Sequence, residues 1–235
     1  MKQKINIAVI LAAGKGSRLS NGNKNETLKV LSKINGKYLI LENIQKLRSI
    51  LHVKKIYIVG GYKINELKKF FNNHDKSIKI INNKEWEKGN GFSFKVACKL
   101  LKEKLFYMQA GDHYFNDILY KKVYLSKLDY AVACSKKLSF FHDFNDATKV
   151  FSKKFKILDI GKKIIKFNGF DAGFFIINPK KLQLKKSYAS ISEILQNSKK
   201  KINRFNIENN DWIDLDTKTD IKNFKTALKN KIFTL

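Results

Sequence analysis

The 235-residue sequence is poor in proline, cysteine and arginine, and each shortage narrows what the protein can be. A single proline and scattered glycines provide no Pro- or Gly-rich linker, so we expect one domain over residues 1–235. The two cysteines, Cys98 and Cys134, form no CxxC motif and have no histidine nearby in sequence. This argues against structural zinc and favours a reducing, cytoplasmic compartment. No apolar run reaches the roughly 18 residues that a membrane span needs.

The positive charge is carried almost entirely by lysine. The formal net charge is +28, with 45 lysines and three arginines. Proteins that read nucleic acids usually rely on arginine for bidentate contacts, whereas lysine is spread here over nearly every segment. The charge therefore indicates compositional drift on solvated faces, and a nucleic-acid partner is not favoured, although a positive field would attract phosphorylated substrates. A non-catalytic nucleotide- or polyanion-binding protein is the alternative of another class.

Short apolar runs alternate with helical patterns along the chain, which predicts an α/β fold with a largely parallel sheet. Strands are expected at 5–12, 55–59, 78–81, 105–109, 131–134 and 174–177. Helices are expected at 40–51, 63–73, 93–104, 191–196 and from 217 onwards, the last two opened by capping boxes. Residues 135–170 are less regular and include short β-like pieces such as 148–151, so we interpret them as an insertion.

The first expected strand ends in "LAAGKGSRL". Glycine lacks a Cβ and therefore lets backbone N–H groups approach a bound phosphate. The stretch is not a Walker loop, and Leu19 stands where a dinucleotide fingerprint has its third glycine. Lys2 and Lys4 before the apolar run also resemble a signal peptide, but Lys15 and Arg18 follow the run at once. We interpret the stretch as a buried strand that delivers a phosphate-binding loop.

Two other segments bring carboxylates to strand ends. In "FYMQAGDHYF" a strand delivers Asp112 at its carboxyl end, where open α/β sheets bind ligands. In "WIDLDT" Asp214 and Asp216 alternate along an extended segment and so share one face. Mg²⁺ binds one or two carboxylates together with substrate phosphates, which makes these residues candidates for a metal site. His113 is a candidate neighbouring ligand, although a lone histidine beside such an aspartate is more often structural.

"LAAGKGSRL" followed by "LKVLSKINGKYLI" resembles the opening of the sugar-phosphate nucleotidyltransferases, which carry LAAGxGxRL and then a lysine before NGKP-I. The resemblance implies a Rossmann-like three-layer α/β/α fold with a mostly parallel mixed sheet. It makes Asp112 and Asp216 the ligands of Mg²⁺, the expected cofactor. It also implies that Arg18 and Lys29 contact the triphosphate, where two cations can neutralise the α-phosphate and the departing pyrophosphate. Leu28 replaces the usual proline before the lysine.

"NKEWEKGNGFSFKVA" adds a second match, to a Gly-Asn-Gly turn that opens a helix and helps to hold the base and ribose in that family. Without the resemblance, the segment would fit an ordinary turn before a helix. The expected nucleotide-binding residues are Leu11, Ala12, Ala13, Gly14, Gly16, Gly89, Asn90, Gly91 and Ser93.

The order "GDHYF", "HDFNDATKV", "FDAGFFIINP" and "WIDLDT" is similar to the CTP:inositol-1-phosphate cytidylyltransferases over roughly residues 5–230. The resemblance implies transfer of a cytidylyl group from CTP to inositol 1-phosphate. Asp146, Lys149 and Asp171 would then line an acceptor pocket, the lysine for phosphate charge and the carboxylates for hydroxyl groups. Ala172 replaces the common threonine of the DTGFF motif. An ionised phosphate is already a nucleophile, so no general base is expected.

Other acceptors fit the same resemblance: a hexose 1-phosphate, phosphocholine or an aminoalkyl phosphonate. A choline site needs an aromatic cage, which Phe140, Phe141 and Phe144 are placed in sequence to supply. Some relatives continue into a membrane-embedded synthase, whereas this sequence stops at Leu235. We therefore expect any such synthase to be a separate polypeptide.

Overall fold

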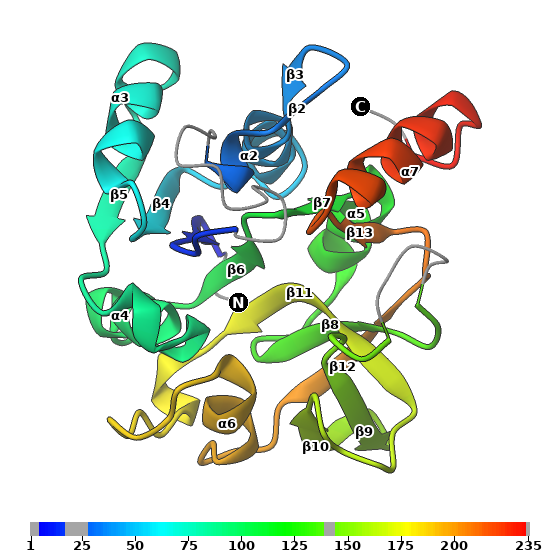
Figure 1. Ribbon diagram of the computed structural model, residues 1–235. Coiled ribbons are helices and arrows are strands. Elements are labelled where there is room, and N and C mark those ends of the chain that lie inside the picture. The colour runs from blue at the N-terminus through cyan, green and yellow to red at the C-terminus, as the bar shows by residue number, and fades with distance from the viewer. Residues whose placement is uncertain (1–4, 17–27, 139–143, 234–235) are drawn as a thin grey trace.

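A computed structural model describes residues 5–16, 28–138 and 144–233 of the chain. A nine-stranded sheet runs through the molecule in the order β5-β4-β1-β6-β11-β8-β12-β10-β9 (Figure 1). Its strands are β1 (Ile7–Ala12), β4 (Lys55–Gly60), β5 (Lys79–Asn82), β6 (Phe106–Ala110), β8 (Ala131–Ser135), β9 (Lys149–Lys153), β10 (Lys156–Gly161), β11 (Gly169–Ile177) and β12 (Asn203–Ile207).

The two halves of the sheet differ in strand direction. β1 pairs in parallel with β4 and β6, and β4 pairs in parallel with β5. β11 runs antiparallel to β6 and β8, although β12 and β8 are parallel. The sheet is therefore mixed, with more antiparallel pairing than the alternation of strands and helices predicts. One antiparallel pair is the hairpin of β9 and β10, which needs no crossover helix, and β11 adds three more by pairing antiparallel with β6, β8 and β9.

Helices cover both faces of the sheet. The helices α2 (Leu39–Ser49), α3 (Ile64–His74) and α5 (Asp117–Leu125) pack on one face, and α4 (Asn90–Leu101) and α6 (Ile191–Gln196) pack on the other. β1 shows why both faces are buried, because Ala8 and Ile10 join the first cluster while Ile7 and Val9 join the second. This arrangement confirms the expected three-layer α/β/α fold.

A smaller unit brings the C-terminal part of the chain back to the centre. The strands β7 (His113–Phe115) and β13 (Trp212–Asp214) pair antiparallel, and α7 (Lys218–Lys229) packs on them through Phe224. In Figure 1 this unit lies beside the end of β6. A second short pair, β2 (Lys33–Ile34) and β3 (Lys37–Tyr38), precedes α2. Three single-turn 3-10 helices complete the elements: η1 (Lys29–Leu31), η2 (Trp86–Lys88) and η3 (Pro179–Lys181).

Two helices begin at the capping boxes that the sequence predicts. Both expected capping boxes are present, with Ser190 accepting from the backbone N–H of Glu193 and Thr217 accepting from that of Asp220. Residues 144–170 of the expected insertion form β9, β10 and the start of β11 in the main sheet. Cys98 and Cys134 are buried and free. Within the described ranges, no helix combines the length and the apolar character needed to cross a bilayer.

Candidate active site

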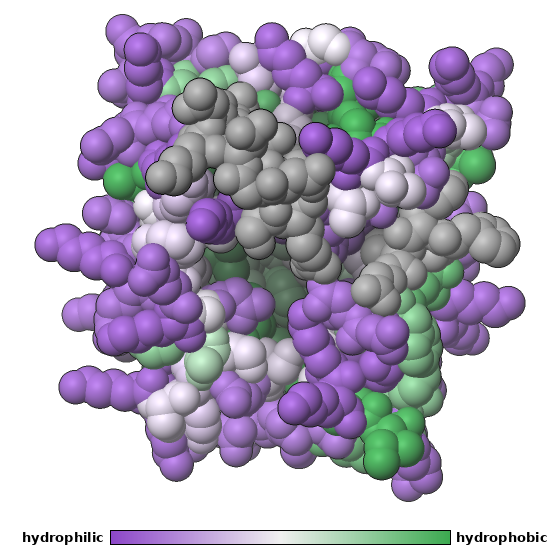
Figure 2. Space-filling model, in the orientation of Figure 1, coloured by the Kyte–Doolittle hydropathy of each residue, from purple (hydrophilic) through white to green (hydrophobic). Residues whose placement is uncertain are grey.

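A cavity of about 880 Å³ opens at the carboxyl ends of β1 and β6. Figure 2 shows this hollow near the centre of the face, with hydrophobic residues inside it and hydrophilic residues around its rim. A second cavity of about 210 Å³ adjoins it, because Leu11, Gly14, Asp112 and Asp216 line both. The strand ends therefore converge on one continuous cleft, as the crevice rule for open α/β sheets predicts.

The glycine loop after β1 closes one wall of the smaller cavity. Gly16 has φ +65°, and a Cβ at this position would lie 2.7 Å from the Cβ of Lys29. Gly111 makes a similar close approach after β6, because a Cβ at this position would lie 2.8 Å from the Leu11 carbonyl oxygen. Only residues without a side chain allow these approaches, so the glycines bring the loop and the β6 end together.

Lys29 is the cation at the centre of the cleft. Its ammonium lies 2.7 Å from Asp112 Oδ2 and 3.8 Å from Asp214 Oδ1, and it also bonds to Asp216. Burial disfavours the charged ammonium, but the three carboxylates outweigh burial and raise the pKa of Lys29 above its ordinary value. Lys29 is therefore held as a cation between the two predicted metal ligands, Asp112 and Asp216.

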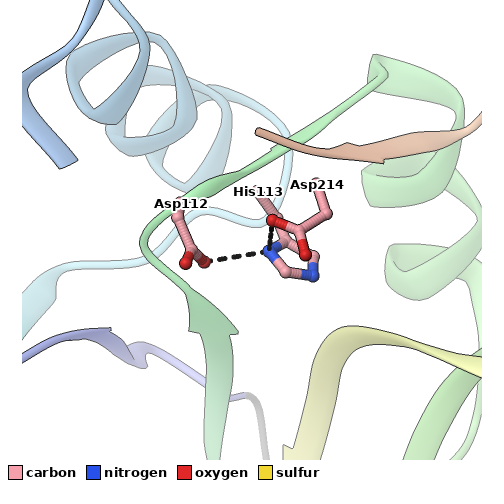
Figure 3. Close-up of side chains that lie close together, drawn as sticks. All are labelled: Asp112, His113 and Asp214. Carbon is pink, nitrogen blue, oxygen red and sulfur yellow. Dashed lines mark hydrogen bonds and ion pairs between the residues drawn. The ribbon is translucent and has the colours of Figure 1, made fainter. Parts of the chain in front are cut away.

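The pairing of β7 with β13 places Asp214 directly opposite His113. His113 Nδ1 lies 2.9 Å from Asp112 Oδ1 and 3.5 Å from Asp214 Oδ1, as the dashed lines in Figure 3 show. The ladder continues into a hydrogen bond from the Leu215 N–H to the Asp112 carbonyl at 3.2 Å. Strand register thus fixes His113 and Asp214 side by side, although they lie 101 positions apart in the sequence.

Charges in this cluster shift one another's pKa values. Burial lowers the pKa of His113, but Asp214 and Asp112 outweigh it and raise the pKa to about 9. Burial raises the pKa of Asp112, yet Lys29 and His113 together hold it well below its usual range. Burial also raises the pKa of Asp214, and the nearby Asp112 adds to the effect. The two cations, Lys29 and His113, therefore offset the repulsion between the neighbouring carboxylates of Asp112 and Asp214.

Four side chains are the candidates for holding a metal ion. Ligand atoms of Asp112, His113 and Asp214 all lie within 4.8 Å of one another. His113 Nδ1 is already paired with the carboxylates of Asp112 and Asp214. Oxygen donors from Asp112, Asp214 and Asp216 suit a hard cation such as Mg²⁺. The donor set fits a magnesium ion, provided that the Lys29 ammonium gives way.

The Gly-Asn-Gly turn before α4 forms another wall of the large cavity. A Cβ on Gly89, which has φ +114°, would lie 2.4 Å from the Ala189 carbonyl oxygen. Gly91 donates its N–H to the same oxygen at 2.9 Å, and Asn90 Oδ1 accepts from the Ile191 N–H at 3.1 Å. The turn therefore docks the segment before α6, a role that the sequence did not suggest.

The predicted nucleotide-binding residues fall on these walls. Those lining the large cavity are Leu11, Ala13, Gly14, Gly89, Asn90 and Ser93. Ala12 and Gly16 line the smaller cavity, whereas Gly91 lines neither. Trp86 and Glu87 also line the large cavity, and nothing in the sequence had marked them as site residues.

Only two of the three predicted acceptor residues line the large cavity. Asp146 and Asp171 line the large cavity, but Lys149 does not. Lys149 is buried, and its ammonium donates to the backbone carbonyls of Phe144 at 3.4 Å and Lys162 at 2.9 Å. Lys162 lines the cavity instead and pairs with Asp146. Sequence reasoning missed Lys162, since nothing in the chain distinguishes it from 44 other lysines.

Asp171 is a carboxylate held in a poorly solvated part of the cavity. Burial raises its pKa to about 6, although the N–H of Gly173, donated to Oδ1 at 2.8 Å, and the charge of His113 both oppose the shift. Hydroxyl groups of a bound ligand would donate hydrogen bonds to the ionised carboxylate and would therefore oppose this rise in pKa.

Three predicted residues, Arg18, Phe140 and Phe141, lie outside the described residues. Phe144 packs against Phe167 and Phe170, with ring centroids 5.9 and 6.0 Å apart, and does not line either cavity. The aromatic cage that Phe140, Phe141 and Phe144 are placed in sequence to supply stays a prediction, because two of its three members lie outside the described residues.

Comparison with known proteins shows the family to which this chain belongs. Residues 8–137, from β1 past the end of β8, match the MobA-like NTP transferase domain. The chain belongs to the MobA-like NTP transferase family. The matched range contains the glycine loop, Lys29, the Gly-Asn-Gly turn and Asp112. It ends before Asp146, Asp171 and Asp216, so these three residues of the cleft lie beyond the matched range.

Individual relatives match more of the chain than the family model does. The bifunctional IPC transferase and DIPP synthase of Aquifex aeolicus is 29% identical over 232 residues, which cover 95% of this chain and 52% of that protein. The chain spans about half the length of the first curated relatives that it matches. The CTP:phosphoglutamine cytidylyltransferase of Campylobacter jejuni is 28% identical over 80% of this chain and 76% of its own length.

Solved structures share the fold of this MobA-like chain. The inositol-1-phosphate CTP transferase from T. maritima superposes with a TM-score of 0.82 at 24% identity, covering 99% of this chain and 98% of that one. A UDP-glucose pyrophosphorylase superposes with a TM-score of 0.77 at 16% identity, covering 97% and 99%. The expected nucleotidyltransferase fold is thereby confirmed.

Proposed function

We propose that the protein is a Mg²⁺-dependent cytidylyltransferase that joins CTP to a phosphorylated polyol and releases pyrophosphate. The proposed acceptor is inositol 1-phosphate and the product CDP-inositol. Relatives named IPC transferase match between 92% and 96% of this chain, which supports this choice of reaction. The observation that carries the proposal is the meeting of Lys29, Asp112 and Asp216 beside a glycine loop at the carboxyl end of β1.

The proposed reaction is a direct displacement. A phosphate oxygen of the acceptor forms a bond to the α-phosphorus of CTP, and the bond from that phosphorus to the pyrophosphate oxygen breaks. The cleft contributes by positioning the two anions and by neutralising charge. Lys29 neutralises charge on the triphosphate, and Arg18 is proposed to assist it.

A bound Mg²⁺ would supply further charge neutralisation to the triphosphate. Asp112 and Asp216 would hold it, with Asp214 beside them. The glycine loop and the Gly-Asn-Gly turn would enclose the nucleotide, while Asp146 and Asp171 would accept hydrogen bonds from hydroxyl groups of the acceptor. His113 is proposed to fix Asp112 and Asp214 in place through its ring nitrogen.

The proposal is tested by incubating the protein with CTP, inositol 1-phosphate and MgCl₂ and identifying the product by mass spectrometry. We expect CDP-inositol and pyrophosphate in equal amounts, and no product when EDTA is added. Asp112→Asn should abolish turnover while leaving the circular dichroism spectrum unchanged. An active Asp112→Asn variant would remove this residue from the metal site, and a different product would replace the proposed acceptor.

We also propose that the protein works in the cytoplasm. Both cysteines are free and buried, which suits a reducing compartment. CTP and phosphorylated metabolites are used there as well.

A further inference from the structure

The turn between β9 and β10 places a phenylalanine at the surface. Lys153 pairs with Lys156 across the hairpin, so the turn itself consists of Lys154 and Phe155. Phe155 is 66% exposed. Figure 2 shows hydrophobic residues at the surface at its lower right, where Figure 1 has β9 and β10. The hairpin therefore presents apolar surface to the solvent.

The backbone of this turn is unfavourable for the residues that form it. Lys154 has φ +43° and Phe155 has φ +62°, both in the left-handed region. Two-residue hairpin turns with two positive φ angles favour asparagine and glycine, because larger side chains are strained there. Strain of this kind is concentrated at functional sites. A contact outside the chain therefore explains Phe155 better than the stability of the turn does.

Lysines surround Phe155 on two neighbouring segments. The Phe155 carbonyl accepts the N–H of Arg204 at 2.8 Å, and the Ile202 carbonyl accepts the N–H of Ile157 at 2.9 Å. Residues 199–201 therefore lie beside the turn. Neither 152–158 nor 197–207 contains an acidic residue. The exposed residues of the turn and of the neighbouring segment form what we call the hairpin surface: Lys153, Lys154, Phe155, Lys156, Lys199, Lys200 and Lys201.

The main sheet holds the hairpin surface in place. Val150 of β9 pairs with Gly169 of β11, and Lys156 of β10 pairs with Asn203 of β12. The Lys156 ammonium also donates to Asn203 Oδ1 at 2.7 Å. No residue of the hairpin surface lines either cavity of the candidate active site. A partner can therefore bind this surface while the cleft stays open.

We propose that the hairpin surface binds a lipid bilayer that carries anionic lipids, with Phe155 inserted among the headgroups. Anionic lipids attract clusters of lysine, and each lysine near the membrane contributes roughly a fivefold gain in affinity. An apolar side chain flanked by lysines gains further by entering the boundary between headgroups and acyl chains. Nucleic acid is the less favoured partner, because the hairpin surface contains no arginine for bidentate contacts.

The first test is co-sedimentation of the full chain with vesicles made of equal parts phosphatidylcholine and phosphatidylglycerol. Vesicles of pure phosphatidylcholine are the neutral reference. We expect binding to the anionic vesicles that weakens as salt concentration rises, and at least tenfold weaker binding to the neutral ones. The assay contains no nucleotide or acceptor, so its result does not depend on the proposed function.

A pair of triple variants separates the hairpin surface from overall charge. One replaces Lys199, Lys200 and Lys201 by glutamine, and the control replaces three exposed lysines on and after α3: Lys68, Lys69 and Lys76. In Figure 1, α3 lies far from β9 and β10. The first variant should bind anionic vesicles at least tenfold more weakly, and the control should change binding less than twofold. Equal losses in both would overturn the proposal.

Phe155→Gly tests insertion without weakening the fold. Glycine adopts a positive φ without strain, so the Tm should be equal to that of the wild type or higher. Binding to anionic vesicles should nevertheless fall about tenfold, because the inserted apolar side chain is lost. Ile165→Gly is the control, since Ile165 is 96% exposed but follows the opposite end of β10. It should change binding less than twofold, and an equal effect of the two variants would contradict insertion of Phe155.

Two further results would overturn the proposal. One is the absence of binding to anionic vesicles by the folded wild type. The other is tighter binding of a single-stranded polynucleotide than of anionic vesicles, with that affinity lost in Phe155→Gly. Bases stack on exposed aromatic side chains, so the second result would assign the hairpin surface to nucleic acid.

Discussion

Replacing Lys29 by methionine should make the stability of the protein depend on a divalent cation. Methionine keeps the unbranched side chain apart from its last atom, and so leaves Asp112, Asp214 and Asp216 without the ammonium that now lies among them. Removing one partner of a buried ion pair costs about 3–5 kcal/mol. Because the three carboxylates are 18% to 33% exposed, we expect a cost at or just below the lower end of this range, about 2–3 kcal/mol.

Mg²⁺, a cation of higher charge, should restore the stability that the Lys29→Met variant loses. In Lys29→Met the carboxylates are open to Mg²⁺, and a ligand at one hundred times its Kd stabilises the folded state by about 2.7 kcal/mol. For a chain of this size that corresponds to a rise in Tm of about 5–10 °C. In the wild type Mg²⁺ must first displace the ammonium, so the rise without nucleotide should be much smaller.

Thermal unfolding followed by circular dichroism, with and without MgCl₂ and with no nucleotide, measures both effects. Lys68→Met is the matched control, because Lys68 is an exposed lysine on α3. It should change stability by less than about 0.5 kcal/mol and show the Mg²⁺ response of the wild type. If Mg²⁺ raised the Tm of Lys29→Met and of the wild type equally, Lys29 and the metal would not share these carboxylates.

Two further substitutions test the walls of the cleft. The pKa of Asp171 is raised to about 6 from an unfolded value of about 3.9, so the folded state binds the extra proton between these values and its stability falls as pH rises through them. Asp171→Asn should remove this decline and raise the free energy of unfolding above pH 6 by about 1–3 kcal/mol, as measured by urea unfolding from pH 4 to 7. Gly91→Ala should destabilise the protein by about 1–3 kcal/mol and weaken CTP binding, because its Cβ would lie 2.7 Å from the Ala189 backbone.

A control is available for Gly91→Ala, and each variant has an outcome that would contradict its prediction. Gly161→Ala places its Cβ in ordinary contact, 3.7 Å from the nearest atom, and should be nearly neutral. If Gly91→Ala were equally neutral, the segment before α6 would not be docked on the turn. If Asp171→Asn kept the pH dependence of the wild type between pH 4 and 6, another group would be its source.

Local patterns predicted much of the fold. The apolar run before Gly14 became β1, and Ser190 with Glu193 formed the expected capping box. The short strand β12 was missed, because its sequence "NRFNI" lacks a clear apolar alternation and is stabilised by its neighbours in the sheet. The helix α5 was also missed, although it packs in the core through Leu119 and Tyr120.

The candidate site was predictable where a residue follows a strand. Asp112 could be placed from the strand before it, but the position of Asp214 depends on the pairing of β13 with β7, which no local pattern specifies. Nothing in the sequence distinguishes Lys149 from Lys162, and only the folded structure shows that Lys162 lines the cleft and Lys149 does not. Register and burial thus decide what motif spacing leaves open.

The most direct test of the central claim is pyrophosphate release with Mg²⁺, crossing four nucleoside triphosphates with inositol 1-phosphate, glucose 1-phosphate and phosphocholine. The account predicts release with CTP and inositol 1-phosphate, and much less with every other pair. Release from a different pair would retain nucleotidyl transfer and change the acceptor or the nucleotide. No release from any pair, with folded protein and saturating Mg²⁺, would contradict the account.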